Sequence, residues 1–213
     1  VHAGHTYDTG TTGGKITLQS VKSGSTSSGA VSISTSDGGT GATGVSGNIE
    51  LSTGATTAGA GNTGTISFTS GKASSGKGGS ITLSVGEGDS GAGGDVSVNA
   101  GKTTAKDSAG GVVTLQSGAS TQGRSGKISL NTLDGGVSGD IEMETGATTG
   151  GTSGIITLST GNAVGGKGGS ITLSVGEGKT GIGGNVIINA GVSSTTDSTG
   201  GIVSIQSGKG TSK

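Results

Sequence analysis

Cysteine, proline and tryptophan are absent from this chain of 213 residues, which also holds only one tyrosine, one phenylalanine and one methionine. Without cysteine no disulfide bond can stabilise the fold, and the chain is compatible with an oxidising or a reducing compartment. With so few aromatic residues, a large hydrophobic core is not expected. A collagen triple helix is excluded because proline is missing and glycine does not recur at every third position. The chain must therefore build any structure around a thin apolar interior.

Charge and long apolar runs are also scarce. The net charge is -1 and the charged residues are scattered, so no basic footprint for nucleic acid is present. No apolar run approaches the roughly 20 residues of a membrane-spanning helix, so no membrane span is expected. The sequence opens at Val1 without a secretion leader or an initiator methionine, and we therefore expect it to be a processed or excerpted piece.

What the chain has instead is glycine, 52 residues of it, and a repeated short phrase. Each phrase places two large apolar residues two positions apart, in most phrases a further modest residue and glycine follow, and phrases recur about every 15 to 17 residues. The two apolar side chains share one face of an extended strand, and the residue between them faces the other way. The apolar pairs are 16/18, 31/33, 49/51, 66/68, 81/83, 96/98, 113/115, 128/130, 141/143, 156/158, 171/173, 186/188 and 203/205.

This periodicity predicts an all-β fold, a β-solenoid in which each unit buries its apolar side by stacking on its neighbours. Two strands per coil of about 30 to 33 residues are favoured, and a three-sided prism is the alternative. In either form Ile81 and Leu83 point inward, and backbone ladders about 4.8 Å apart join the coils. Disorder is the competing outcome of so low an apolar content, and the paired apolar residues and near-zero net charge argue against it.

A longer repeat overlies the short one. The stretch 77–88 returns almost unchanged at 167–178, about 90 residues later. We therefore expect 13–213 to be a single repeat array, part of a longer one, because its last phrase is followed by no capping segment. The stretch 1–12 departs from the repeat and is expected to be an irregular segment that caps one end.

Residues with metal-binding chemistry are few. His2, His5 and Asp8 lie close together near the start, but no third histidine or cysteine completes a site, and no metal site is predicted. Tyr7 beside them is expected to pack over the first coil. Repeated calcium binding is not expected either, because the position before each strand is often Lys15, Thr65 or a similar residue instead of aspartate. Isolated carboxylates that could contact Ca²⁺ or a neighbouring filament are Glu50, Glu87, Glu142, Glu144 and Glu177.

No motif indicates catalysis or a cofactor. Gly86–Gly91 fits a phosphate-loop pattern of glycines, but that pattern is meaningful only between a strand and a helix, and no helical periodicity is present. No histidine or cysteine lies in the repeats, and Arg124 is the only arginine, so no positioned acid, base or nucleophile is predicted and the chain is not expected to be an enzyme.

Outward threonines raise a different function, the binding of ice or glycans. They are Thr17, Thr82, Thr114, Thr157 and Thr172. Their rows are interrupted by other residues, namely Gln19, Glu142, Glu144, Ile187 and Asn189. Ice or glycan binding therefore stays the alternative.

The phrases Gly-Gly-x-(Ile/Val)-x-(Leu/Val/Ile)-x-(Ala/Ser)-Gly, with Ser/Thr/Gly spacers such as 170–184, resemble the large Gly/Ser/Thr-rich repeat proteins secreted by diatoms and related stramenopile algae. The resemblance covers Thr11 to Gly208 and carries no catalytic residue. It implies an extracellular structural protein, secreted or at the cell surface, that forms or belongs to a filament, stalk, adhesive or surface matrix. The partners expected are other copies, end to end or side by side, with O-linked or matrix glycans left open.

Overall fold

The computed structural model describes residues 3–4, 13–41, 43–57 and 61–210, and these ranges contain no helix and no strand. The prediction of an all-β solenoid is therefore wrong, both as two strands per coil and as a three-sided prism. The alternating phrases do run as extended chain, but no sheet joins them. We call each phrase an apolar segment, defined by the pair of large apolar residues that it carries.

The missing sheet is explained by the backbone hydrogen bonds. A folded protein makes about one hydrogen bond per residue, most of them between backbone groups. In the described ranges the backbone bonds to itself at six places only, and none of them continues into a ladder. Three of the six join glycine pairs that are ten residues apart: Gly14 to Gly4, Gly111 to Gly101 and Gly201 to Gly191. Neighbouring apolar segments thus meet at single points.

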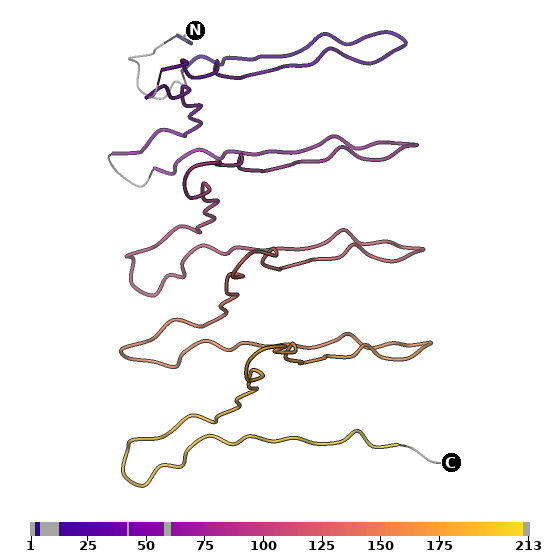
Figure 1. Cartoon of the computed structure of the whole chain (residues 1–213). Coiled ribbons are helices and arrows are strands. Elements are labelled where there is room, and N and C mark those ends of the chain that lie inside the picture. The colour runs from indigo at the N-terminus through magenta and orange to yellow at the C-terminus, as the bar shows by residue number, and fades with distance from the viewer. Residues whose placement is uncertain (1–2, 5–12, 42, 58–60, 211–213) are drawn as a thin grey trace. The chain divides into compact units, whose positions relative to one another are not determined.

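Between successive apolar segments the chain doubles back, and Figure 1 shows the two runs lying side by side along narrow arms. The corners are short bends rich in glycine, serine and threonine. Glycine and serine are favoured there because they suit tight changes of direction. The described corners are 24–26, 40–41, 74–76, 89–91, 105–107, 121–123, 135–137, 149–151, 164–166, 179–181 and 195–197.

Each doubling-back closes where one glycine meets a residue just past the preceding apolar pair. We call the enclosed stretch a return loop and its two contacting residues the loop base. A side chain on Gly94 would place its Cβ 2.9 Å from Cγ1 of Val85, so only glycine fits there without a shift. The remaining loop bases are Ser20/Gly29, Thr35/Gly47, Thr53/Gly64, Ser70/Gly79, Ala100/Gly111, Ser117/Gly126, Thr132/Gly139, Thr145/Gly154, Thr160/Gly169, Val175/Gly184 and Ala190/Gly201.

Two return loops, from Ala100 and from Ala190, contain an aspartate with positive φ. Asp107 has φ of 59° and Asp197 has φ of 63°, and they occupy the same place in the 90-residue repeat. Aspartate tolerates this left-handed conformation better than most residues because its short polar side chain bonds locally. Both loops close with a backbone bond of 2.8 Å between glycines.

The predicted cap, 1–12, falls mostly outside the described residues. Its two described members behave like the repeat: Gly14 donates its amide to the carbonyl of Gly4 at 3.0 Å, and a Cβ on Gly14 would lie 3.1 Å from that of Ala3. This is the loop base seen at Ala100/Gly111 and Ala190/Gly201. Ala3 and Gly4 therefore form a loop base with Gly14, and the prediction that 1–12 is a cap is otherwise untested.

The chain divides into two units, Val1–Val113 and Thr114–Lys213. In neither unit does any described residue reach full burial. The few half-buried residues are small, and most belong to loop bases or lie three positions after one. They are Ala3, Ser20, Ser23, Gly38, Thr103, Ser117, Thr145, Ala190 and Ser193. Whatever shielding the chain gives itself is thus concentrated at the loop bases.

Candidate functional site

A metal or catalytic centre would need several reactive side chains together, and the described part of the chain holds no group of three or more His, Cys, Asp or Glu that could hold a metal ion. His2, His5, Tyr7 and Asp8 lie outside the described residues. Arg124 is exposed in the return loop that follows Ser117. The described ranges therefore offer no such group of metal ligands.

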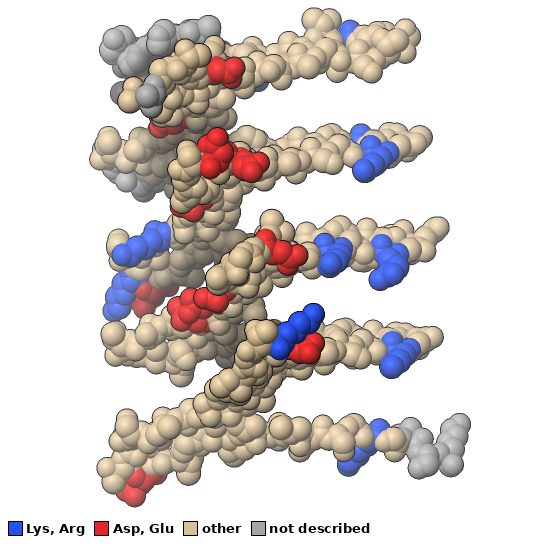
Figure 2. Space-filling model, viewed as in Figure 1, with Lys and Arg blue, Asp and Glu red and all other residues tan. Residues whose placement is uncertain are grey.

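The five glutamates considered for calcium are all exposed and are not gathered. Glu50 and Glu142 lie between the two apolar residues of their segments, whereas Glu87 and Glu177 occupy return loops. Figure 2 shows acidic and basic side chains in small separate groups along this face, divided by long uncharged stretches. A calcium site takes six to eight oxygen ligands, and the described carboxylates do not supply such a set.

The glycines of Gly86–Gly91 form part of the return loop between Val85 and Gly94, with a corner at 89–91. A phosphate loop directs its amides from the start of a helix, and no helix follows here within the described residues. The outward threonines, such as Thr82 and Thr172, are exposed on segments that no sheet aligns.

The prediction that the apolar pairs point inward is wrong, because their side chains are exposed. Ile81 is 63% exposed and Leu83 is 77% exposed, where both were predicted to point into a core. In all thirteen pairs the first residue is less exposed than the second, as in Val203 at 47% and Ile205 at 86%. The pairs are therefore exposed apolar groups, and the first residue of each pair is somewhat more shielded than the second.

Return loops bring the apolar pairs of successive segments level with one another. Because Ser70 meets Gly79 at the loop base and the two runs of chain are antiparallel, Phe68 lies opposite Ile81 and Ile66 lies opposite Leu83. The structure forms a shallow apolar hollow at this point, lined by Phe68, Ile81, Thr82 and Leu83. We call Ile66, Phe68, Ile81 and Leu83 the apolar patch of this arm. The sequence carried a signal for it, since the pairs sit at matching distances on both sides of each corner.

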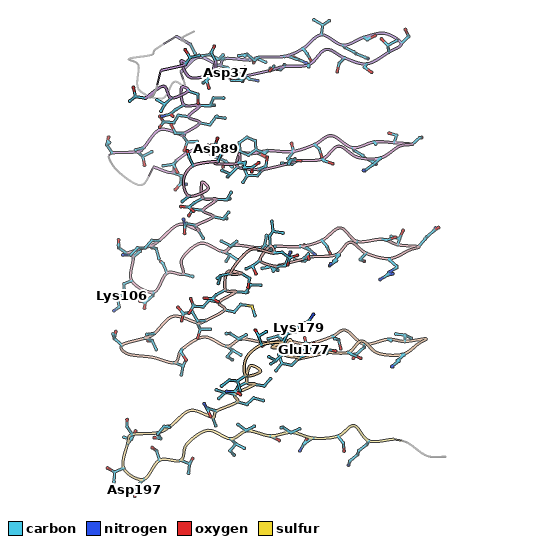
Figure 3. All side chains as sticks on the ribbon, in the orientation of Figure 1. Asp37, Asp89, Lys106, Glu177, Lys179 and Asp197 are labelled. Atoms are coloured by element: carbon cyan, nitrogen blue, oxygen red, sulfur yellow. The ribbon has the colours of Figure 1, made fainter. Side chains whose placement is uncertain are left out.

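Serine and threonine hydroxyl groups form hydrogen bonds with backbone groups of the return loops. Thr35 Oγ1 donates to the carbonyl of Gly47 at 3.0 Å, across its loop base. Ser120 Oγ accepts the amide of Gly123 at 2.9 Å, and Ser198 Oγ donates to the carbonyl of Thr195 at 2.9 Å. Figure 3 shows the side chains standing off the ribbon along both runs of each arm, with Asp197 at a corner. Hydroxyls thus serve the loops while the segments display apolar groups.

In the described residues no helix has the length and apolar character required to cross a membrane. No known protein family, no curated protein and no solved structure matches this chain. Its candidate site is the set of exposed apolar patches, held in position by glycine at the loop bases.

Proposed function

We propose that this chain is a non-enzymatic structural protein that works by associating with copies of itself, end to end or side by side. Its setting is extracellular, in a filament, stalk, adhesive or surface matrix. The extracellular setting rests on the resemblance to secreted algal repeat proteins, and the exposed hydroxyls suit hydration and contact with matrix glycans.

The observation that carries the proposal is the exposed surface of the single chain. Its accessible area is 21169 Å². A folded monomer of 19.6 kDa exposes about 8,600 Å², and the same chain fully extended exposes about 28,400 Å². The single chain thus leaves uncovered an excess of about 12,600 Å² over a folded monomer of its mass. Part of this surface is apolar, because the large aliphatic side chains are exposed, and association with other chains would cover that part.

Composition favours a mechanical role over a chemical one. The described carboxylates are dispersed, and the repeat supplies the same small set of residues many times over. A repeated surface suits a partner that repeats as well, and fibrous assemblies are built in that manner.

Sedimentation velocity and negative-stain electron microscopy of the 213-residue chain test the proposal. At micromolar concentration we expect species several times heavier than 19.6 kDa and elongated particles of uniform width. Monodisperse monomers at every concentration would refute self-association. Thermal hysteresis or ice shaping by such a monomer would instead support the ice-binding function.

A further inference from the structure

The apolar patch at Phe68 and Ile81 recurs in the second half of the chain. Ninety residues on, Ile156, Leu158, Ile171 and Leu173 stand in the same places around the loop base Thr160/Gly169. All four are exposed, like their counterparts. An equivalent set of exposed apolar residues therefore occurs in both units, 90 residues apart in the sequence.

We propose that the apolar patches are the contact surface between copies of this chain, each patch receiving apolar segments of another copy. This inference rests on the proposed self-association and names the surface that performs it. It assigns a shared role to Ile66, Phe68, Ile81 and Leu83 and to their counterparts near Leu173.

The occupant is a second copy, for two reasons. First, the patch sequence returns after 90 residues, so a second copy offers each patch the same kind of apolar segment that the patch itself contains. Second, the net charge of -1 leaves little electrostatic repulsion to keep two copies apart.

The open backbone of the segments supports the same partner. The described segments make no ladder of their own, so most of their amide and carbonyl groups have no backbone hydrogen-bond partner within the described chain. An interface that buried only the apolar side chains would leave these backbone groups without hydrogen-bond partners, whereas an extended segment from another copy can hydrogen-bond with them. The uncovered area per chain, about 12,600 Å², far exceeds the roughly 800 Å² per partner that a stable interface uses. One chain can therefore contact several copies.

The test compares three double variants by sedimentation equilibrium. Ile81→Ser with Leu83→Ser removes half of one patch and is expected to weaken self-association at least about 100-fold, since two large aliphatic side chains lose their burial. Ile81→Val with Leu83→Ile keeps the patch apolar and should stay within about tenfold of the parent. Val164→Ser with Ile182→Ser is the matched control, because these return-loop residues are 106% and 101% exposed and belong to no pair; it should leave association unchanged.

The outcomes separate this inference from the function on which it rests. If the parent associates and the serine variant associates equally well, the patch at Phe68 and Ile81 is not a contact surface, although the structural function stands. If the control weakens association as much as the serine variant, the effect is general hydrophobicity and the inference fails. If the parent is monomeric but its patches bind phosphatidylcholine vesicles or a detergent micelle, the occupant is a lipid and both proposals fail. The expected pattern is loss in the serine variant alone.

Discussion

At the loop bases this chain touches itself through its smallest residues, whereas along the apolar segments its largest residues face solvent. Ala190 and Ser117 are half-buried, while Leu83 and Ile205 are mostly exposed. Globular proteins show the reverse, with large aliphatic residues most often inside. The comparison indicates two separate tasks: the loop bases set where each segment lies, and the segments carry surface that the single chain does not cover.

The division also explains the glycine content. At a loop base a Cβ on the glycine would collide with the opposite run, with the backbone nitrogen of Gly101 at Gly111 and with a valine side chain at Gly94 and Gly184. Close approach of backbones is a recognised use of glycine. The contact at a loop base orients the segments but buries little surface area. The favourable free energy that a stable structure needs therefore has to come from contacts between chains.

The largest expected effect comes from dilution, which separates the two regions directly. If stability comes from contacts between segments of different chains, the midpoint of thermal unfolding depends on protein concentration. A thousandfold dilution should lower that midpoint by about 8–16 °C, from a free-energy change of about 4 kcal/mol. Circular dichroism melts across that range provide the measurement. A midpoint that does not move would mean that the loop bases alone hold the structure.

The second prediction concerns a loop base itself. Gly94→Ala brings a Cβ to 2.9 Å from Val85 Cγ1 and should cost about 1–3 kcal/mol of stability by overpacking. Gly93→Ala is the matched control, because a Cβ there would meet nothing within 4 Å, and it should change stability by less than about 0.5 kcal/mol. The measurement is the shift in the thermal midpoint at one fixed concentration.

A compensating variant sharpens that result. Val85→Ala removes the methyl groups that the new Cβ would meet, so combining it with Gly94→Ala should recover most of the loss. The same cycle can be run at Val175 and Gly184, where the corresponding distance is 2.8 Å. Equal losses for Gly93→Ala and Gly94→Ala would show that Gly94 does not meet the Val85 side chain at this loop base.

Local geometry could be predicted from the sequence better than the fold. The apolar pairs, the 90-residue repeat and the glycine-rich corners were all visible as patterns. The small third position after each pair was also seen, at Ser20, Val85 and Ala100, and the structure places these residues at loop bases. What failed was the step from alternation to a sheet, because alternation says that one side of a segment is apolar but not what covers it.

The candidate site shows the same limit. The alternation identified Ile81 and Leu83 as the residues whose surface matters, yet it assigned them to an interior that the single chain lacks. Covering them inside one chain requires successive segments to form continuous ladders, and the described backbone bonds are confined to single points. The matching distance of the pairs from each corner was the available signal for the apolar patches, since it aligns Phe68 with Ile81.

A third, smaller effect is expected at the aspartates with positive φ. Asp197→Val should cost about 1–2 kcal/mol, because a β-branched residue is strained in the left-handed region, whereas Asp197→Gly should be neutral or slightly stabilising. Asp197 has φ of 63° and Asp107 has φ of 59°, so the two positions should respond alike. Thermal midpoints of the four variants provide the measurement. A glycine variant as destabilised as the valine variant would mean that the carboxylate, and not the backbone angle, matters there.

The smallest expected effect concerns a loop hydroxyl. Ser120 Oγ accepts the amide of Gly123 at 2.9 Å in a return loop. The group is exposed, so water replaces the lost partner and Ser120→Ala should cost no more than about 0.5 kcal/mol. Ser125→Ala, on the other side of the corner, is the control for losing any serine in this loop. Amide hydrogen exchange offers the more sensitive measurement, since the exchange rate of Gly123 should rise in the first variant and stay unchanged in the second. An unchanged Gly123 rate in both would mean that the corner holds its shape without the hydroxyl, leaving the Ser117/Gly126 loop base as its only anchor.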